Sequence, residues 1–337
     1  MKLLFPILGC LALAGTWARF GKKVLAALSV CKLDERLYGL TFRGDYGFDA
    51  FLKQGGAANE GEMAAYITEF LSGGFAKAPQ PPKQEFGCST LAKNGMMGRN
   101  FDWEGAPGKA MIVRTKPRDG YESVATCWLE FLGFGPEWKP EGFANQYMAL
   151  ASIYVPLDGI NEKGLCVADL VNGDEEHTAQ DTGKIKLTTN TAIRYLLDRA
   201  ADVEEALELL RGIDMNSAIG MSHHLSIADA KGRSVVVEYV NGEMLVTDTD
   251  TVTNHYLCPG EKQGVGNDES KARLWRLREL DVKTPEQMRD AMSANSYEGL
   301  TRWTCVFCMK GNKPAVIYHW DRDYAYEHAL YFVIPDR

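Results

Sequence analysis

The sequence predicts an α+β protein built in layers, with antiparallel strands packed against helices. After residue 88 the chain alternates short apolar stretches with tight-turn sequences, which is typical of antiparallel hairpins. Two blocks with helical spacing, 189–211 and 269–294, interrupt these strands. The turn sequences lie at 93–95, 161–164, 229–232, 241–242 and 311–312.

The composition is that of a folded protein with a sizeable core, because 45% of its 337 residues are hydrophobic and 24% are charged. A formal charge of −8, with no long run of Lys or Arg, argues against nucleic acid as a partner. The eight cysteines are too scattered for a disulfide framework. Cys305 and Cys308 lie on an expected strand, where residues three apart face opposite ways, so we expect neither a redox nor a metal pair there.

The first 31 residues form a hydrophobic segment with two opposing signals. Residues 3–15 are apolar and follow Lys2, which resembles a signal peptide or short anchor, although this stretch is too short to span a bilayer as a helix. Arg19, Lys22 and Lys23 come next, and positive charge after an apolar stretch favours the cytoplasmic side. We expect membrane-surface association or export; the alternatives are a misassigned start codon and a plain N-terminal helix.

The part before residue 88 is expected to be a helical leader that ends in a linker. Helical spacing runs over 46–75, and the proline-rich stretch 78–82 predicts an exposed linker. The chain therefore divides into the hydrophobic segment 1–31, the helical leader and linker 32–87, and a domain over 88–337.

Capping sequences set helix boundaries in the two later blocks. In the first block a helix begins after Asp202, with Glu205 three residues on, and ends at Gly212. This block is therefore expected to hold two helices. In the second block Thr284, followed by Pro285, marks a helix start.

A tight hairpin is predicted over residues 86–103, because Asn94-Gly95 is a preferred dipeptide for a two-residue turn. With that turn the paired positions sum to 189, so 90 pairs with 99 and 87 pairs with 102. Cys88 and Arg99 then lie diagonally on one face of the hairpin. A guanidinium close to a thiol favours the thiolate.

Cys88 is the candidate nucleophile. A thiol must lose its proton to attack an amide, and an α-amino group with a pKa of about 8 is a suitable base when it belongs to the same residue. That group exists only after cleavage before Cys88, and Gly87 would let the thiol approach the preceding carbonyl. Asp102, facing position 87, would hold the amine by a charge-assisted hydrogen bond. Such a mechanism needs no metal or organic cofactor.

Other interpretations of these residues compete with this one. Cys88 could be a buried strand cysteine beside an ordinary surface ion pair. A papain-like site would need a Cys-His pair in a sequence context that is absent here. His223 and His224 face opposite sides of a strand and make a poor metal pair. Six aromatic residues could line an acyl pocket or pack in the core: Phe101, Trp103, Trp128, Phe131, Phe134 and Trp138.

An ordered set of motifs resembles the choloylglycine hydrolase family: Gly87-Cys88-Ser-Thr, Gly98-Arg99-Asn-Phe-Asp102-Trp, Asn161-Glu-Lys-Gly-Leu, Val252-Thr-Asn254 and Ser270-Lys-Ala-Arg273. The resemblance covers about residue 86 to the C-terminus. It implies a four-layer αββα fold with two antiparallel sheets, typical of hydrolases with an N-terminal nucleophile. This superfamily includes bile salt hydrolases, penicillin V acylases, N-acylethanolamine acid amidases and acid ceramidases.

The resemblance also implies a role for each matched residue. Cys88 resembles the family's nucleophile and its freed amine resembles the base, while Arg99 and Asp102 match the signature arginine and aspartate. Asn254 resembles the asparagine that donates to the oxyanion, and Arg273 resembles the last arginine of the catalytic site. For Arg273 the alternative is an ordinary charge on a helix surface.

Two positions depart from the family pattern. The family's second oxyanion contributor falls on Val171, with Asn172 next to it, so a backbone N–H would have to serve in place of a side chain. The hairpin between Cys88 and Arg99 is also shorter than is usual in the family.

The long helical leader resembles that of amidases acting on N-acylethanolamines and ceramides. We therefore expect a small-molecule amide substrate with a fatty acyl group, cleaved to fatty acid and amine. The alternatives are a bile salt hydrolase that releases glycine or taurine, a penicillin V or homoserine-lactone acylase, and a non-catalytic binding protein on the same fold. Assembly into a homo-oligomer stays open.

Overall fold

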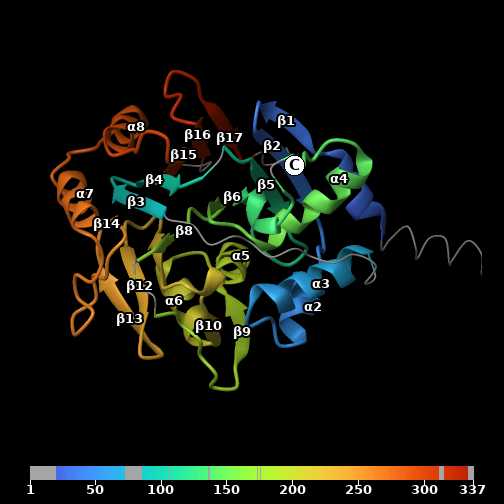
Figure 1. Ribbon diagram of the computed structural model, residues 1–337, viewed down its shortest axis with the longest axis horizontal. Helices are drawn as coiled ribbons and strands as arrows, with labels where there is room; N and C mark the ends of the chain where they lie inside the picture. The colour runs from blue at the N-terminus through green and yellow to red at the C-terminus, as the bar shows by residue number, and fades with distance from the viewer. Residues whose placement is uncertain are drawn as a thin grey trace, which may run out of the picture.

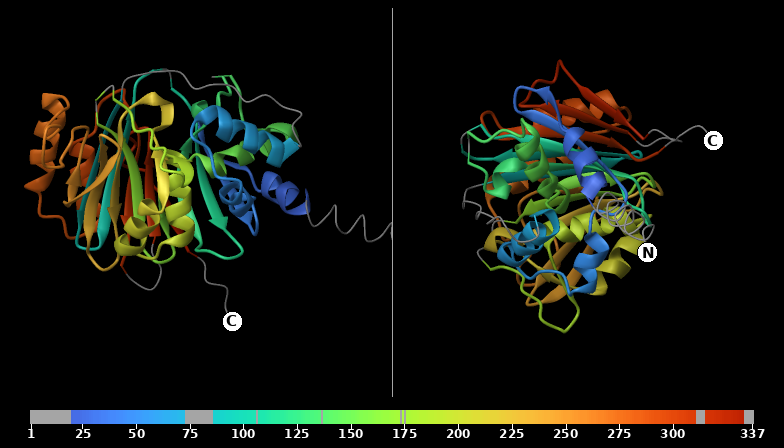
Figure 2. Two further views of the ribbon diagram at one scale, coloured as in Figure 1. Left: turned by 90° about the horizontal axis from the view of Figure 1, so that it is seen from below. Right: turned by 90° about the vertical axis from the view of Figure 1, so that its right-hand side faces the viewer.

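The computed structural model describes residues 20–72, 86–105, 107–135, 137–172, 174, 176–310 and 315–332. Two large sheets face each other and helices cover their outer sides (Figures 1 and 2). Figure 1 places helices α7 and α8, in orange, on the opposite side of the molecule from α2 and α3, in blue. The predicted α+β class and its αββα layering are confirmed.

The larger sheet has nine strands in the order β1-β2-β5-β6-β7-β8-β11-β12-β13 within the described residues. Neighbouring strands run antiparallel, except that β2 and β5 are parallel. The strands are β1 (Cys31–Asp34), β2 (Leu37–Arg43), β5 (Ala110–Lys116), β6 (Ser123–Trp128), β7 (Asp158–Asn161), β8 (Cys166–Val171), β11 (His223–Ala228), β12 (Ser234–Val240) and β13 (Glu243–Asp248).

The second sheet has the order β14-β3-β4-β15-β16-β17 and is antiparallel in the part of the chain that is described. Its strands are β14 (Thr251–Val252), β3 (Phe86–Lys93), β4 (Met96–Trp103), β15 (Thr301–Cys308), β16 (Ala315–Trp320) and β17 (His328–Tyr331). A short parallel pair, β9 (Ile185–Thr188) and β10 (Ile213–Asn216), lies apart from both sheets.

The helices fall into the outer layers. Helices α5 (Thr189–Arg199) and α6 (Val203–Arg211) belong to the nine-stranded side, and α7 (Asp268–Arg278) and α8 (Pro285–Ala294) cover the six-stranded sheet. The others are α2 (Phe48–Lys53), α3 (Glu60–Ser72), α4 (Phe143–Met148) and the 3₁₀ turns η1 (Leu129–Leu132), η2 (Ala149–Tyr154) and η3 (Ala218–Gly220); residues 20–28 are also helical.

An apolar layer fills the space between the sheets. Phe101 and Trp303 stack there with ring centroids 4.1 Å apart, and Cys88 belongs to the same cluster. A second cluster packs α5 and α6 on the nine-stranded sheet, and a third packs α7 and α8 on the six-stranded one. The candidate nucleophile therefore lies in the interior layer.

The prediction that residues 32–87 are purely helical is wrong, because the leader also contains strands. The expected helices are present as α2 and α3, but β1 and β2 precede them and β2 joins the main sheet beside β5. Most of β2 is buried on both faces, so its sequence lacks the alternation that marks a half-buried strand.

The capping predictions are confirmed. Asp202 accepts from the backbone N–H of Glu205 at 3.0 Å and α6 ends at Gly212. Thr284 accepts from the N–H of Gln287 at 3.3 Å, one residue before α8 begins. The turn predicted at 311–312 lies outside the described residues.

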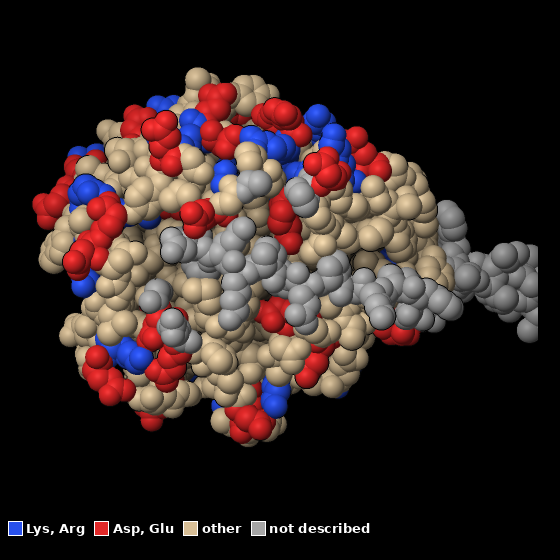
Figure 3. Space-filling view, viewed as in Figure 1, with Lys and Arg blue, Asp and Glu red and all other residues tan. Residues whose placement is uncertain are grey.

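The hydrophobic residues 3–15 also lie outside the described part of the chain. Among the described residues no helix has the length and apolar character needed to cross a membrane. The seven cysteines in that part are free. On the face drawn in Figure 3, acidic and basic side chains are interspersed.

Candidate active site

The β3–β4 hairpin has the predicted register. Gly87 pairs with Asp102, and Thr90 pairs with Arg99. The turn residues Asn94 and Gly95 have φ angles of 53° and 75°, as a two-residue turn of this type requires. The hairpin is central to its sheet, because β14 pairs with β3 and β15 pairs with β4.

The two faces of this hairpin carry different parts of the candidate site. Cys88 and Arg99 lie on the inner face, toward the nine-stranded sheet, where Arg99 is fully buried. Asp102 lies on the outer face, where it meets Arg273 of α7. Because side chains alternate along a strand, the peptide between residues 87 and 88 passes between these two groups.

Arg99 is neutralised on the inner face by a carboxylate that sequence analysis did not single out. Its Nε lies 2.9 Å from Asp158 Oδ2, and its Nη2 donates to the carbonyl oxygen of Asp169 at 3.1 Å. Asp158 also accepts from the indole N–H of Trp303 at 2.9 Å. The charge beside the thiol is therefore part of a buried, paired network.

Burial dominates the protonation of the thiol. It raises the pKa of Cys88 to about 11, against the charge of Arg99, which acts to lower it. The predicted direction of the Arg99 effect is right, and burial outweighs it in the uncut chain. At neutral pH the uncut chain therefore holds Cys88 as a protonated thiol.

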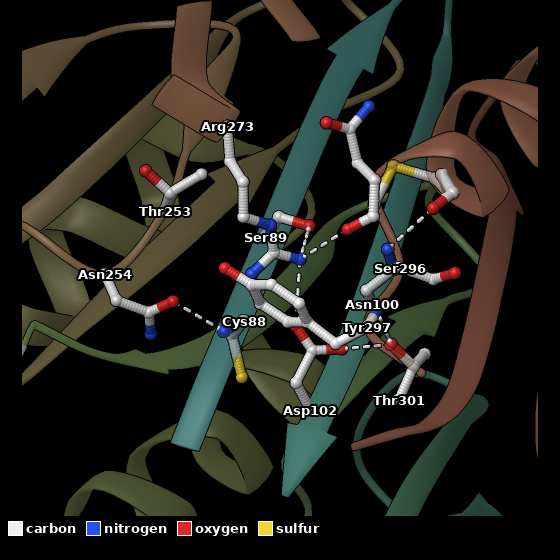
Figure 4. Close-up of polar contacts among 12 residues, drawn as sticks. Cys88, Ser89, Asn100, Asp102, Thr253, Asn254, Arg273, Ser296, Tyr297 and Thr301 are labelled. Carbon is white, nitrogen blue, oxygen red and sulfur yellow. Dashed lines mark hydrogen bonds and ion pairs between the residues drawn. The ribbon is translucent and has the colours of Figure 1, made fainter. Parts of the chain in front are cut away.

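On the outer face Asp102 is held by two side chains. Arg273 Nη2 lies 2.8 Å from Oδ2, and the hydroxyl of Thr301 donates to Oδ1 at 2.6 Å (Figure 4). Burial raises the pKa of Asp102, and these two partners oppose that rise. A Cβ at Gly87 would lie 3.3 Å from Asp102 Oδ2, so the carboxylate directly faces the predicted cleavage site.

Arg273 is the arginine of α7 that reaches the site. Besides Asp102, it donates to Ser89 Oγ at 3.1 Å and to the carbonyl of Asn295 at 2.8 Å, and its guanidinium stacks 4.3 Å from the ring centre of Tyr297. Arg276 instead pairs with Glu269 at the surface. The helix-surface alternative for Arg273 is excluded by these buried contacts.

Asn254 joins the nucleophile to the opposite sheet. Its Oδ1 accepts from the backbone N–H of Cys88 at 2.6 Å, and its Nδ2 donates to the carbonyl of Val171 at 2.6 Å (Figure 4). Only this orientation of the amide satisfies one donor and one acceptor at once. Among the described residues the second N–H of Nδ2 makes no hydrogen bond.

The loop that carries Asn254 is anchored to α7. His255 Nδ1 lies 2.8 Å from Ser270 Oγ, and Thr253 Oγ1 donates to the Ser270 carbonyl at 2.9 Å. Burial lowers the pKa of His255 to about 4, so this histidine is neutral at physiological pH. One helix thus fixes both Asn254, through Ser270, and Asp102, through Arg273.

The two residues expected near the oxyanion differ in position. Val171 lines the pocket beside Cys88. The N–H of Asn172 donates to the Ser222 carbonyl at 3.1 Å and is therefore committed to the sheet. Of this pair, Val171 is the residue with access to the pocket.

The pocket beside Cys88 is largely apolar. Three of the six expected aromatic residues line it, namely Phe101, Trp103 and Phe131, whereas Trp128 packs between the sheets. Its volume of about 40 Å³ has room for a few water molecules. The remaining lining residues are Glu60, Met63, Val155, Leu157, Asp169, Val171, Asn190, Ala218, Ile219 and His223.

A polar wall of this pocket was not found from the sequence. His223 Nδ1 lies 2.9 and 3.0 Å from the two carboxylate oxygens of Asp169, and its Nε2 lies 2.9 Å from the Ala218 carbonyl. Burial acts to lower the pKa of His223, but the Asp169 carboxylate and the Ala218 carbonyl, which only accept, raise it overall and favour the imidazolium. His224 faces the other way and pairs with Glu238, as strand alternation predicts.

Within the described residues no three His, Cys, Asp or Glu side chains gather in the geometry of a metal site. Four charged groups near Cys88 are matched in pairs, Arg99 with Asp158 and His223 with Asp169.

Comparisons with known proteins identify the family and the fold. The sequence model of the acyl-coenzyme A:6-aminopenicillanic acid acyl-transferase family matches residues 90–310. A penicillin V acylase from Pectobacterium atrosepticum is 30% identical over 99 residues, which are 26% of this chain and 26% of that enzyme. A conjugated bile acid hydrolase from Clostridium perfringens superposes with a TM-score of 0.51 at 17% identity, over 73% of this chain and 92% of that one. The similarity to the bile acid hydrolase structure shows that the two proteins share a fold.

Proposed function

Because the chain belongs to the acyl-coenzyme A:6-aminopenicillanic acid acyl-transferase family, we propose that it is a self-processing cysteine amidohydrolase. It would cut itself before Cys88 and then hydrolyse linear amide bonds. One observation carries the proposal: the amide nitrogen of Cys88 is bound by Asn254, while the Asp102–Arg273 pair faces Gly87. The atom that would become the free amine thus already lies among groups suited to hold it.

In the first step the Cys88 sulfur attacks the carbonyl carbon of Gly87. The thiol gives up its proton to water before the attack, the C–N bond between the two residues breaks as the departing nitrogen takes a proton from water, and the leader is left as a thioester on sulfur. Water then hydrolyses the thioester, which frees the thiol and leaves a carboxylate on Gly87. The products are a leader that ends at Gly87 and a chain that begins with Cys88.

In turnover the freed α-amino group takes the thiol proton. The thiolate attacks the substrate carbonyl, and the remaining N–H of Asn254, with a backbone N–H at Val171, holds the oxyanion. The α-ammonium protonates the leaving amine, and Asp102 holds that ammonium in place. The α-amino group of Cys88 then deprotonates a water molecule, which hydrolyses the acyl-thioester and restores the thiol.

The cut leader would stay with the catalytic domain as a second chain. Strand β2 is bonded along its length to β5, which lies beyond the cleavage site. Phe42, Phe48 and Phe51 of the leader are buried in the core cluster that packs on the nine-stranded sheet. Removing this surface would expose several large apolar side chains to water.

Fatty N-acyl amides are our preferred substrates, with release of fatty acid and amine. The apolar lining by Phe101, Trp103 and Phe131 supports a hydrophobic acyl group. Bile salts, and penicillin V or acyl-homoserine lactones, are alternative substrates for the same chemistry. A non-catalytic binding protein is the alternative from another class.

The test is to separate the purified protein under denaturing conditions and read the N-terminus of the larger fragment beside a Cys88→Ala control. We expect a fragment that starts Cys-Ser-Thr-Leu in the wild type and an uncut chain in the control. The cut protein is then offered N-acyl ethanolamines, conjugated bile salts and penicillin V. An uncut wild-type chain that hydrolyses these amides would refute the free-amine mechanism.

A further inference from the structure

Charged side chains from three separate elements line the pocket beside Cys88: Glu60, Asp169 and His223. The charges of two of these residues cancel, because the His223 imidazolium is bound to the Asp169 carboxylate. Arg99, deeper in the site, is likewise matched by Asp158. Glu60 is the third lining charge, and among the described residues it forms no ion pair. The pocket wall therefore carries a net negative charge.

Glu60 is fixed in this wall by a contact with the loop opposite. As the first residue of α3 it is half-buried, and its carboxylate accepts from the backbone N–H of Ile219. Ile219 has a φ of 49°, an unfavourable conformation for a β-branched residue, so its position depends on its neighbours. The adjacent Ala218 is bonded on both sides, its N–H to Thr189 at 3.2 Å and its carbonyl to His223.

This contact holds the Glu60 carboxylate in the wall of the pocket beside Cys88. One oxygen is engaged by Ile219, so the side chain cannot swing fully into solvent without breaking that bond. A second anion brought into the same partly desolvated pocket would be repelled more strongly than in water. A neutral or cationic group would meet no such penalty.

From this we infer that Glu60 selects substrates by charge. It disfavours amides that carry a carboxylate or sulfonate near the scissile bond and admits amides of neutral or cationic amines. The inference rests on the proposed amidase function and narrows its substrate class. It also makes the leader part of the specificity of the cut enzyme, because Glu60 lies upstream of the cleavage site.

The test uses three dodecanoyl amides with one acyl chain and different amines: ethanolamine (neutral), glycine (anionic) and ethylenediamine (cationic). Wild-type enzyme is expected to favour the neutral and cationic amides, and this preference should shrink as salt is raised. In Glu60→Gln, which keeps an oxygen for the Ile219 N–H, the ratio of kcat/KM for the glycine amide to that for the ethanolamine amide should rise roughly tenfold.

Glu69→Gln is the matched control, because it removes the same charge from the exposed side of the same helix. It should leave the ratio unchanged. An active enzyme whose ratio does not move in Glu60→Gln overturns the inference and leaves the amidase function intact.

A protein without activity on any amide would refute the function and not yet the charge selection. In that case the role of Glu60 is tested by binding. The affinities of the ethanolamine and glycine amides for the Cys88→Ala protein are measured by titration calorimetry. The role of Glu60 is supported if the neutral amide binds more tightly than the anionic one and if this difference becomes smaller in the Cys88→Ala, Glu60→Gln double variant. Equal affinities, or a difference that Glu60→Gln does not change, overturn it.

Discussion

The inner and outer faces of the β3–β4 hairpin differ in what surrounds their charges. On the inner face Cys88 lies in an apolar layer, and the guanidinium of Arg99 on that face is already paired with Asp158. On the outer face Asp102 lies in a polar network with Arg273 and Thr301. The apolar side favours the protonated thiol of Cys88, whereas the polar side holds the Asp102 carboxylate where it could bind the α-amino group freed by cleavage.

This division explains why the site lies astride one strand. The α-amino group of a cut Cys88 would belong to the backbone, so it can be reached from the outer face while its thiol points inward. An ordinary side-chain base would have to share the inner face and be buried with the sulfur. The backbone amine would instead lie beside the Asp102 carboxylate, whose charge offsets part of the cost of burying an ammonium.

Removing the outer carboxylate should have the largest effect. In Asp102→Asn the buried guanidinium of Arg273 loses its ion-pair partner, which we expect to lower the free energy of unfolding by about 3–5 kcal/mol. Urea denaturation measures this directly, and the N-terminus of the protein reports whether cleavage is also lost. Asp281→Asn, at an exposed pair with Lys283, is the control, with an expected loss below about 1 kcal/mol. A loss this small in Asp102→Asn would contradict the proposed network.

The inner face predicts a strong pH dependence of self-cleavage. The thiolate attacks, and the pKa of Cys88 is raised to about 11, so the rate should rise about tenfold per pH unit and level off only near pH 11. Precursor prepared near pH 6 and shifted to higher pH, with the cut fraction followed over time, gives this profile. A rate that is flat between pH 7 and pH 9 would show that thiol ionisation does not limit cleavage.

The variant Arg99→Met tests how far the charge on the inner face shifts the pH profile of self-cleavage. The charge of Arg99 lowers the pKa of Cys88, so its loss should move the whole profile to higher pH and slow cleavage at pH 8 by roughly tenfold. Arg276→Met, which removes a surface arginine of α7, should leave the profile in place.

Local rules were enough to predict the hairpin and its two faces. The Asn94-Gly95 turn fixed the register, and the two-residue period of a strand then put Arg99 with Cys88 and Asp102 opposite Gly87. These relations span fewer than twenty residues, so no knowledge of the tertiary structure was needed. The resemblance to a family added Asn254 and Arg273, which lie far along the chain but meet the hairpin in space.

The partners that neutralise the site could not be predicted in the same way. Asp158, Asp169 and His223 come together only because β7, β8 and β11 are neighbours in the sheet, and nothing local specifies that order. Charged residues within apolar strand sequences were the available signal. Glu60 reaches the pocket only because the leader docks beside it, and the docking strand β2 lacked a recognisable alternation.

The smallest of these effects is expected at the glycine between the two faces. A Cβ at position 87 would lie 3.2 Å from Tyr297 and 3.3 Å from both Arg273 and Asp102, close enough that these neighbours must shift by a few tenths of an ångström. Gly87→Ala should therefore cost about 1–2 kcal/mol of stability and slow self-cleavage a few-fold, because the displaced groups are those that face the amide.

Gly98→Ala provides the matched control on the same outer face. Its Cβ would press on Met288 and Met292 of α8, away from the cleaved bond, so it should cost stability without slowing cleavage once the protein is folded. Cleavage rates and urea midpoints measured on both variants separate the two effects. If both alanines slow cleavage equally, packing of the hairpin rather than access to the Gly87 carbonyl controls the reaction.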